Sequence, residues 1–292
     1  MTDRTWVGGI NNNAADPNNW SPNGVPVPGD TLTMLSGTMD VHGDDLAGDT
    51  LVIGANQTSA TATLNLSRHA NASLDIAQFS TDQVTVNARG SDTLSVRTEF
   101  PSGLSLTVNL ADHARLTGGF TMTFGSATLN GGAGSRFVND GTSHFGGSSA
   151  IFDTDVRGTG TFDVSTAQSS AGNLEFGGSV SRGQTIDVRG DPGRGIASHI
   201  RIDQPDAFQG TANLNLFGEV DLQGLANADS YTFQNDMLSI YSGDTVVDTV
   251  RLTLPPPPIG QNFDLAVYQT ATGVAIDRGA VPPGGTLLPV HV

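Results

Sequence analysis

The stretch Ala62-Thr63-Leu64-Asn65-Leu66 alternates apolar and polar residues, the pattern of a β-strand with one buried face. The same alternation returns every ten residues, five times in all. The apolar pairs at these positions are Leu64 and Leu66, Leu74 and Ile76, Val84 and Val86, Leu94 and Val96, and Leu104 and Leu106. A constant spacing of this kind indicates an internal repeat.

Two architectures can use such a repeat. An antiparallel meander favours tight Asn-Gly or Asp-Gly turns, but these occur only at Asn23-Gly24, Asn130-Gly131 and Asp140-Gly141, outside the ten-residue register. A solenoid instead stacks equivalent short strands from successive coils and buries a continuous apolar column. We therefore predict an all-β fold, a right-handed parallel β-helix with capped ends, in which two ten-residue steps make a coil of about 20 residues.

Three regions are expected along the chain. Residues 1–60 are rich in Asn, Pro and Gly and are predicted to form an N-terminal cap and entry segment. Residues 61–254 keep the alternating pattern and are predicted to form the solenoid body. The proline run Pro255–Pro258 cannot donate to a ladder, so residues 255–292 are predicted as a linker followed by a C-terminal β segment. A final hairpin is expected from residues 263–267 and 273–276.

Composition excludes several classes of function. The formal net charge is −16, so the surface should repel nucleic acid. All 13 basic residues are Arg. The chain has no Cys, which removes disulfides and thiol chemistry. No apolar run approaches the roughly 18 residues that a membrane helix requires, so membrane insertion is not expected. Asp accounts for most of the acids, as short polar side chains suit solenoid turns.

Catalytic candidates are few. Asp44 and Asp45 beside His42 form the densest acidic cluster, and a pair of carboxyl groups is what glycoside hydrolysis needs. A solvated turn between two strands explains the same residues, and we favour that interpretation. No nucleophile elbow, P-loop or dinucleotide fingerprint occurs. We assign no catalytic and no cofactor-binding residue and expect the protein not to be an enzyme.

Metal motifs are incomplete. Asp153 and Asp155 imitate the start of an EF-hand loop, but Arg157 and Val164 stand where oxygen ligands belong. Residues 131–136 begin like a calcium-binding nonapeptide, but Arg136 replaces the required Asp. The six His residues show no ligand pair at i and i+4; they are His42, His69, His113, His144, His199 and His291. Isolated Ca²⁺ ions on Asp and backbone oxygens stay open, so the metal site is left unknown.

Both Trp residues, Trp6 and Trp20, lie in the Asn-rich N-terminal segment. Two aromatic rings in such a loop could stack on sugar rings. A solenoid also needs bulky apolar groups to cover its open end. We favour the second interpretation, in which the two indoles plug the end of the solenoid.

Several stretches resemble the β-helices of bacterial surface proteins. Residues 6–9, 16–21, 24–26 and 28–32 are similar to the N-terminal entry segment of autotransporter-passenger-like β-helices. Residues 158–162, 172–178, 183–188 and 202–210 resemble the repeat units of large secreted adhesins. The resemblance implies a scaffold of the bacterial cell surface, exported without a cleavable N-terminal signal.

From these observations we expect an extracellular or cell-surface structural protein, adhesin-like or assembling into fibres through end-to-end solenoid contacts. Its expected partners are copies of itself and surface or matrix polysaccharide. The alternative is a polysaccharide-binding module or a carbohydrate-active β-helix enzyme, with a lateral groove lined by Asp, Arg and an aromatic residue. Residence inside the cell is a third interpretation, since no signal peptide is visible.

Overall fold

The computed structural model describes residues 2–9, 11–46, 48–53, 61–76, 83–98, 103–256, 264–279 and 285–291. It confirms the predicted fold class, because the chain is all-β and forms a β-solenoid of about 8 turns. The chain forms two compact units, residues 1–139 with 153–155 and residues 140–152 with 156–292. Among the described residues, no helix is long and apolar enough to cross a membrane.

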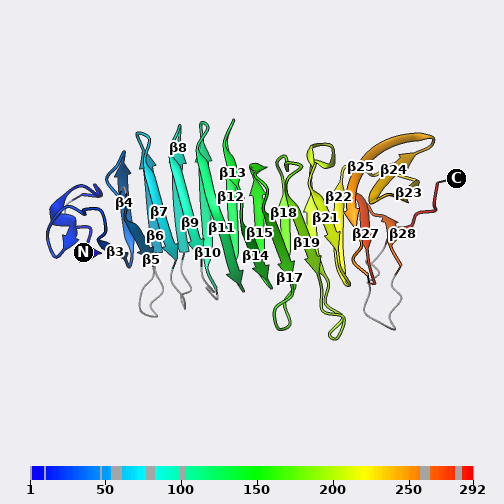
Figure 1. Ribbon diagram of the computed structural model, residues 1–292, viewed down its shortest axis with the longest axis horizontal. Helices are drawn as coiled ribbons and strands as arrows, with labels where there is room; N and C mark the ends of the chain where they lie inside the picture. Colours follow the sequence, from blue (N-terminus) through cyan, green and yellow to red (C-terminus); the bar gives the residue numbers. More distant parts are fainter. Residues whose placement is uncertain are drawn as a thin grey trace. The chain divides into compact units, whose positions relative to one another are not determined.

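The first unit contains two ladders of mostly parallel strands (Figure 1). One ladder runs in the order β2, β1, β3, β5, β7, β9, β11, β13, and the other in the order β4, β6, β8, β10, β12. The strands of the first ladder are β1 (Asp3–Trp6), β2 (Trp20–Ser21), β3 (Thr31–Met34), β5 (Thr50–Ile53), β7 (Asn71–Ile76), β9 (Thr93–Thr98), β11 (Arg115–Thr123) and β13 (Arg136–Val138). Those of the second are β4 (Gly37–His42), β6 (Thr61–Ser67), β8 (Gln83–Arg89), β10 (Ser105–Ala111) and β12 (Ser126–Gly131).

Over β6, β8 and β10 the coil is longer than two ten-residue steps. Leu64 pairs with Val86 and Val86 with Val108, so equivalent positions are 22 residues apart. A shift of two residues leaves every side chain on the same face of its strand, since side chains alternate with period 2. The apolar residues therefore still point inward, and Leu64, Val86, Val108 and Leu129 stack in one fully buried column.

The second unit also has two ladders (Figure 1). One follows the order β14, β17, β19, β21, β25, β24, β23, and the other β15, β18, β20, β22, β27, β26, β28. The first set comprises β14 (Thr142–Gly146), β17 (Thr161–Ser165), β19 (Thr185–Arg189), β21 (Thr211–Leu214), β23 (Ser230–Gln234), β24 (Met237–Ser242) and β25 (Thr245–Thr253). The second comprises β15 (Ser149–Asp153), β18 (Asn173–Phe176), β20 (Ser198–Ile202), β22 (Gly218–Gln223), β26 (Ala266–Gln269), β27 (Gly273–Asp277) and β28 (Thr286–Leu287).

Phenylalanine fills the core of the second unit. Phe162 meets Phe176 edge on with ring centroids 5.3 Å apart, and it stacks on Phe145 at 6.4 Å. Phe152 contacts Phe162 edge on at 5.5 Å. All four side chains are fully buried. Edge-to-face and offset contacts of this kind add to the apolar burial that holds successive coils together.

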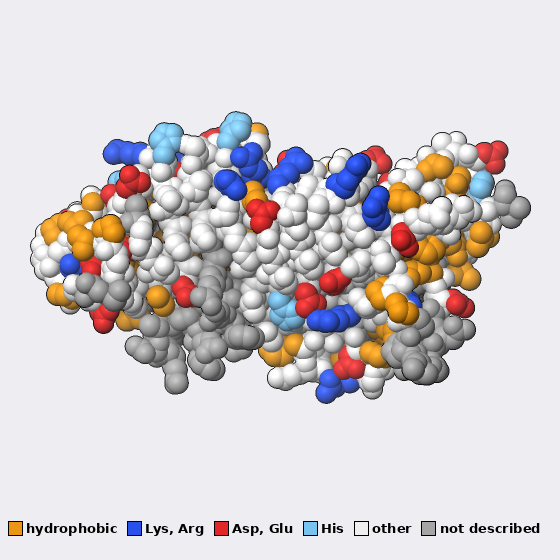
Figure 2. All heavy atoms as spheres, viewed as in Figure 1, with side chains coloured by type: hydrophobic (Ala, Val, Ile, Leu, Met, Phe, Trp, Pro, Cys, Tyr) orange, Lys and Arg blue, Asp and Glu red, His pale blue; other side chains and the backbone are white. Residues whose placement is uncertain are grey.

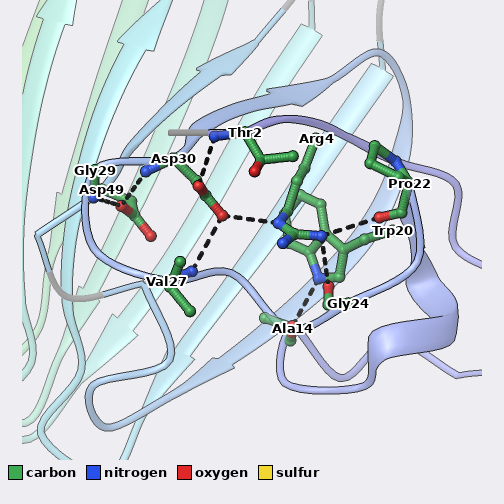
Figure 3. Close-up of polar contacts among 10 residues, drawn as sticks. All are labelled: Thr2, Arg4, Ala14, Trp20, Pro22, Gly24, Val27, Gly29, Asp30 and Asp49. Carbon is green, nitrogen blue, oxygen red and sulfur yellow. Dashed lines mark hydrogen bonds and ion pairs between the residues drawn. The ribbon is translucent and has the colours of Figure 1, made fainter.

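The N-terminal plug is confirmed by the structure. Trp6 and Trp20 are 4% and 2% exposed, and their rings meet edge on at 5.3 Å. The indole Nε1–H of Trp20 donates to the carbonyl oxygen of Ala14 at 2.8 Å (Figure 3). Because both rings are buried against the protein, the alternative in which they stack on sugar rings is wrong.

An ion pair ties the N-terminal strand to the next coil (Figure 3). Arg4 Nε donates to Asp30 Oδ2 at 2.8 Å, and the backbone N–H of Thr2 donates to Asp30 Oδ1 at 2.8 Å. The guanidinium of Arg4 also donates to the carbonyl oxygens of Pro22 and Gly24. The Arg4 hydrogen bond, followed by the Thr2 hydrogen bond, lowers the pKa of Asp30 below its ordinary value.

The regular ladders start earlier in the chain than expected. Thr31 of β3 pairs in parallel with Thr50, and both lie within the predicted cap of residues 1–60. Gly37 of β4 pairs with Ala62, just after the end of that cap. These strands carry the same alternation as the body, but they do not share its ten-residue register. Sequence periodicity alone therefore placed the start of the solenoid too late.

The C-terminal region contains the predicted hairpin and one that was missed. β26 and β27 pair antiparallel, which confirms the expected final hairpin, although residues 257–263 lie outside the described part of the chain. β23 and β24 form a further hairpin inside the predicted solenoid body. Its turn residues Asn235 and Asp236 have φ of 52° and 59°. Asn and Asp tolerate this left-handed conformation, so the pair replaces the Asn-Gly or Asp-Gly of the usual tight turn.

Candidate functional site

The acidic pair singled out in the sequence lies in the turn after β4. The carboxylate of Asp45 accepts the backbone N–H of His42 at 2.8 Å, and Nδ1 of His42 lies 2.7 Å from Oγ of Ser67. Asp45 thereby closes a local turn, as Asp commonly does in polar loops. This geometry supports the interpretation of the cluster as a turn.

The incomplete calcium motifs lie at strand ends. Asp153 ends β15, Asp155 begins β16 (Asp155–Arg157), and Gly131 and Arg136 flank the turn between β12 and β13. Within the described ranges, no group of three or more His, Asp or Glu side chains is placed to hold a metal ion. The alternative of isolated Ca²⁺ ions stays a prediction.

An asparagine ladder runs along the outer face of the first unit. Asn65 Nδ2 donates to Asp40 Oδ1 at 2.7 Å. Asn87 donates in the same way to Asn65, Asn109 to Asn87, and Asn130 to Asn109, each at 2.8 Å. The ladder therefore joins β4, β6, β8, β10 and β12 through identical side-chain hydrogen bonds.

A groove follows this ladder. It has a volume of about 500 Å³ and is lined by Asp40, His42, Asn65, Leu66, Ser67, Asn87, Ala88, Arg89, Asn109 and Ala111. We call it the Asn groove. Rungs of a sheet repeat about every 4.8 Å, so the four ladder residues that line the groove extend over about 14 Å. Amide groups line its length, and one carboxylate and one guanidinium balance its charge.

A threonine column borders the ladder on the same strands. Thr63, Thr85 and Thr107 occupy equivalent positions on β6, β8 and β10, two residues before the ladder asparagines. Figure 2 shows that much of the visible surface of the protein is white, the colour of uncharged side chains and backbone. The Asn groove is thus bordered by uncharged hydroxyl and methyl groups.

The sequence carried a signal for this ladder that the ten-residue repeat concealed. Thr63-x-Asn65, Thr85-x-Asn87 and Thr107-x-Asn109 recur 22 residues apart. A search for recurring polar residues, in addition to apolar pairs, would have indicated a spacing of 22 residues, and the strand register then makes these asparagines neighbours. Asn receives no attention in a search for catalytic groups, because it does not titrate.

A second groove lies on the outer face of β15, β18, β20 and β22 in the other unit. Its volume is about 420 Å³. His199 Nδ1 lies 2.9 Å from Glu219 Oε2, and Arg201 Nε donates to Asp203 Oδ1 at 2.7 Å. Charged side chains therefore meet in this groove, and its lining also includes Glu175 and Asp221.

Two titratable groups of the second groove have pKa values that are raised by their surroundings. Burial, and then the neighbouring Glu219, raises the pKa of Asp221 above its ordinary value. The hydrogen bond that His199 donates to Glu219 raises the pKa of His199, and the charges of Asp277 and Asp221 add to that effect. A carboxyl group with a raised pKa beside a second carboxyl group is a pattern found in acid–base catalysis, and it also arises in structural ion pairs.

No protein family, curated protein or solved structure matches this chain. The resemblance to bacterial surface β-helices therefore stays a prediction. The fold and the two grooves define the protein as a β-solenoid with lateral polar grooves, and its function has to be argued from them.

Proposed function

We propose that the protein is an extracellular, adhesin-like binding protein that holds a neutral polysaccharide chain in the Asn groove. The observation that carries the proposal is the ladder of Asn65, Asn87 and Asn109 along a groove of about 500 Å³. Each amide gives one N–H to its neighbour and keeps a second N–H and a free lone pair for a ligand. Donors and acceptors thus repeat from rung to rung.

A repeating ligand fits a repeating surface. Sugar hydroxyls donate and accept hydrogen bonds, as the side-chain amides do, and a polymer can engage several rungs at once. The groove balances one carboxylate against one guanidinium, and the chain as a whole has a net charge of −16. A strongly anionic polymer would be repelled by this overall charge, so a neutral chain is favoured.

Co-sedimentation with insoluble neutral polysaccharides, such as cellulose, chitin and xylan, tests this function. Asn87→Ala removes the central amide of the groove, and we expect about fivefold weaker binding to the polysaccharide that the wild type retains. Asn213→Ala is the matched control, because Asn213 also donates to a neighbouring rung, at Asp187 Oδ1, but lies in the other unit. The control should bind like the wild type. Absence of binding to every polysaccharide tested would contradict the proposal.

A carbohydrate-active enzyme is the second candidate, and the second groove favours it. Glycoside cleavage uses two carboxyl groups, and this groove holds Asp221, whose pKa is raised, two residues from Glu219. A reducing-sugar assay on soluble polysaccharides tests this candidate. Turnover that is lost in Glu219→Gln but kept in Asn87→Ala would establish it, and a blank assay would remove it.

Filament formation stays a prediction. The strands at two ladder ends offer little backbone for end-to-end pairing, since β2 and β28 have two residues each. The edge of β23 is partly covered, because the backbone N–H of His291 donates to the carbonyl oxygen of Tyr231 at 2.7 Å. Negative-stain electron microscopy of the purified protein distinguishes filaments from dispersed particles.

A further inference from the structure

An acid occupies the buried face of β25. Asp248 lies on the same face as Val250 and Leu252 and is only 7% exposed. Within the described part of the chain, its Oδ2 has no hydrogen-bond partner. A backbone hydrogen bond from Thr249 reaches the carboxyl group, so one of its two oxygens is left unpartnered. Burial of that oxygen costs free energy, so this position calls for a physical explanation.

The strand is irregular beside this acid. Ile240 of β24 pairs with Asp248, but the next residue, Tyr241, pairs with Val246. Val247 is therefore the extra residue of a β-bulge, a feature that redirects side chains and is common near binding sites. Asp248 itself reaches the inner face by the regular alternation that it shares with Val250 and Leu252, and the bulge lies directly beside it.

Asp248 lines a cavity of about 340 Å³, which we call the Asp248 pocket. Apolar side chains form part of its wall, namely Pro205, Phe208, Met237 and Val246. The pocket also contains three other charged residues, Asp206, Arg182 and Arg251. Burial, and then the charge of Asp206, raises the pKa of Asp248 to about 6. Among the described residues, neither arginine donates a hydrogen bond to Oδ2 of Asp248.

The chemistry of the pocket defines its ligand. A buried carboxylate with a free oxygen needs a cationic hydrogen-bond donor, and apolar walls suit an alkyl chain behind that cation. An ammonium group brings three donors and no acceptor. The chain has no Lys of its own, so its own residues offer no ammonium side chain. We propose that the Asp248 pocket binds an alkylammonium ion, the group found in lysine side chains and in aliphatic diamines.

Titration calorimetry of the full chain with 1,5-diaminopentane and with N-acetyl-lysine methylamide tests this proposal. Saturable binding of either probe at about neutral pH is expected, and absence of binding by both would overturn the proposal. Preference for the diamine would identify a free amine as the ligand, and preference for the lysine derivative would identify a lysine side chain. Ca²⁺ that binds at Asp248 and displaces both amines would also overturn it.

Three variants locate the site. Asp248→Asn keeps the side-chain volume and should weaken amine binding by about tenfold, as expected when a charged hydrogen bond is lost. Asp206→Asn alters an exposed residue, so it tests the pocket without disturbing the core, and binding should fall severalfold. Asp187→Asn, in the same unit but outside the pocket, should bind like the wild type. Unchanged binding in both pocket variants would overturn the proposal.

The pH dependence provides an independent measurement. Since the pKa of Asp248 is about 6, amine binding should weaken by about tenfold when the pH is lowered to about 5. Equal amine affinity of the wild type at neutral pH and at about pH 5 would contradict a role for the Asp248 carboxylate. The polysaccharide test of the Asn groove uses a different unit and different variants, so either proposal can fail without the other.

Discussion

Asn87 donates its side-chain Nδ2–H to Oδ1 of Asn65 at 2.8 Å, although 22 residues separate them in the sequence. Asn87 also accepts from Asn109, whereas Asn130, at the last described position of the ladder, donates one such bond. We expect Asn87→Ala to lower the free energy of unfolding by about 1 kcal/mol, and Asn130→Ala to lower it by less. Urea unfolding followed by circular dichroism measures both. A larger effect at Asn130 would show that the ladder is not cooperative.

The N-terminal plug should contribute strongly to stability. Trp20→Ala is expected to lower the free energy of unfolding by about 3–5 kcal/mol, because it leaves a cavity beside Trp6. Trp20→Phe keeps most of the apolar volume but loses the hydrogen bond to Ala14, so a smaller loss is expected. Thermal unfolding of the two variants measures the difference. Equal stability of Trp20→Ala and wild type would contradict the role of Trp20 as a plug.

The Arg4–Asp30 ion pair predicts a loss of stability in acid. The pKa of Asp30 is lower in the folded state than its ordinary value, so folding favours the ionised form. The stabilisation by ionised Asp30 is present above about pH 4, the ordinary pKa of an Asp. It is lost as the pH falls through the lower pKa that Asp30 has in the folded protein. The wild type should therefore be more stable than Asp30→Asn at neutral pH, and the difference should shrink in acid. Urea unfolding at several pH values measures this; a constant difference would contradict it.

His199 predicts the opposite pH dependence. Its hydrogen bond to Glu219 raises the pKa of the imidazole above its ordinary value of about 6.5. The stabilisation is therefore complete below about pH 6.5 and is lost as the pH rises through the folded pKa. Titration of the His199 ring by NMR should give the raised value, and Glu219→Gln should lower it. A pKa unaffected by Glu219→Gln would show that the pair does not interact in solution.

Two glycines of the second unit provide a matched comparison. A Cβ at Gly190 would lie 2.3 Å from the carbonyl oxygens of Ile196 and Phe217, whereas a Cβ at Gly141 would meet nothing within 4 Å. Gly190→Ala should therefore cost more than about 2 kcal/mol, since backbone atoms must move. Gly141→Ala should change stability by less than about 0.5 kcal/mol. Similar costs for both would contradict the close approach at Gly190.

The hydrophobic alternation was sufficient to predict the solenoid. Residues such as Leu64 and Val86 occupy the inner face because strand side chains alternate, and that property does not depend on which strand is the neighbour. The plug of Trp6 and Trp20 followed from the same reasoning, since an open apolar column needs a cover. Both features depend on residue type and local spacing, which the sequence contains directly.

The length of the coil could not be predicted in the same way. A step of 20 residues and one of 22 place the same residues inside, so the apolar pattern does not distinguish them. The hydrogen-bond register distinguishes them, and it aligns Asn65, Asn87 and Asn109. The Asn groove therefore exists because the strand register places these asparagines side by side. Its residues are ordinary surface asparagines until the strands are paired.

The pocket around Asp248 is a second feature that the sequence alone did not predict. In the sequence, Asp248 alternates with Val250 and Leu252 and so falls on the apolar face of its strand, but nothing there shows which groups surround it. Strand pairing places the bulge at Val247 beside it, and segments far away in the chain supply the other walls of the pocket. The sequence by itself determined the all-β solenoid, its apolar interior and its plugged end, because these follow from local alternation. Only the tertiary structure decided the coil length, the Asn groove and the Asp248 pocket, because these depend on pairing between residues far apart in the chain.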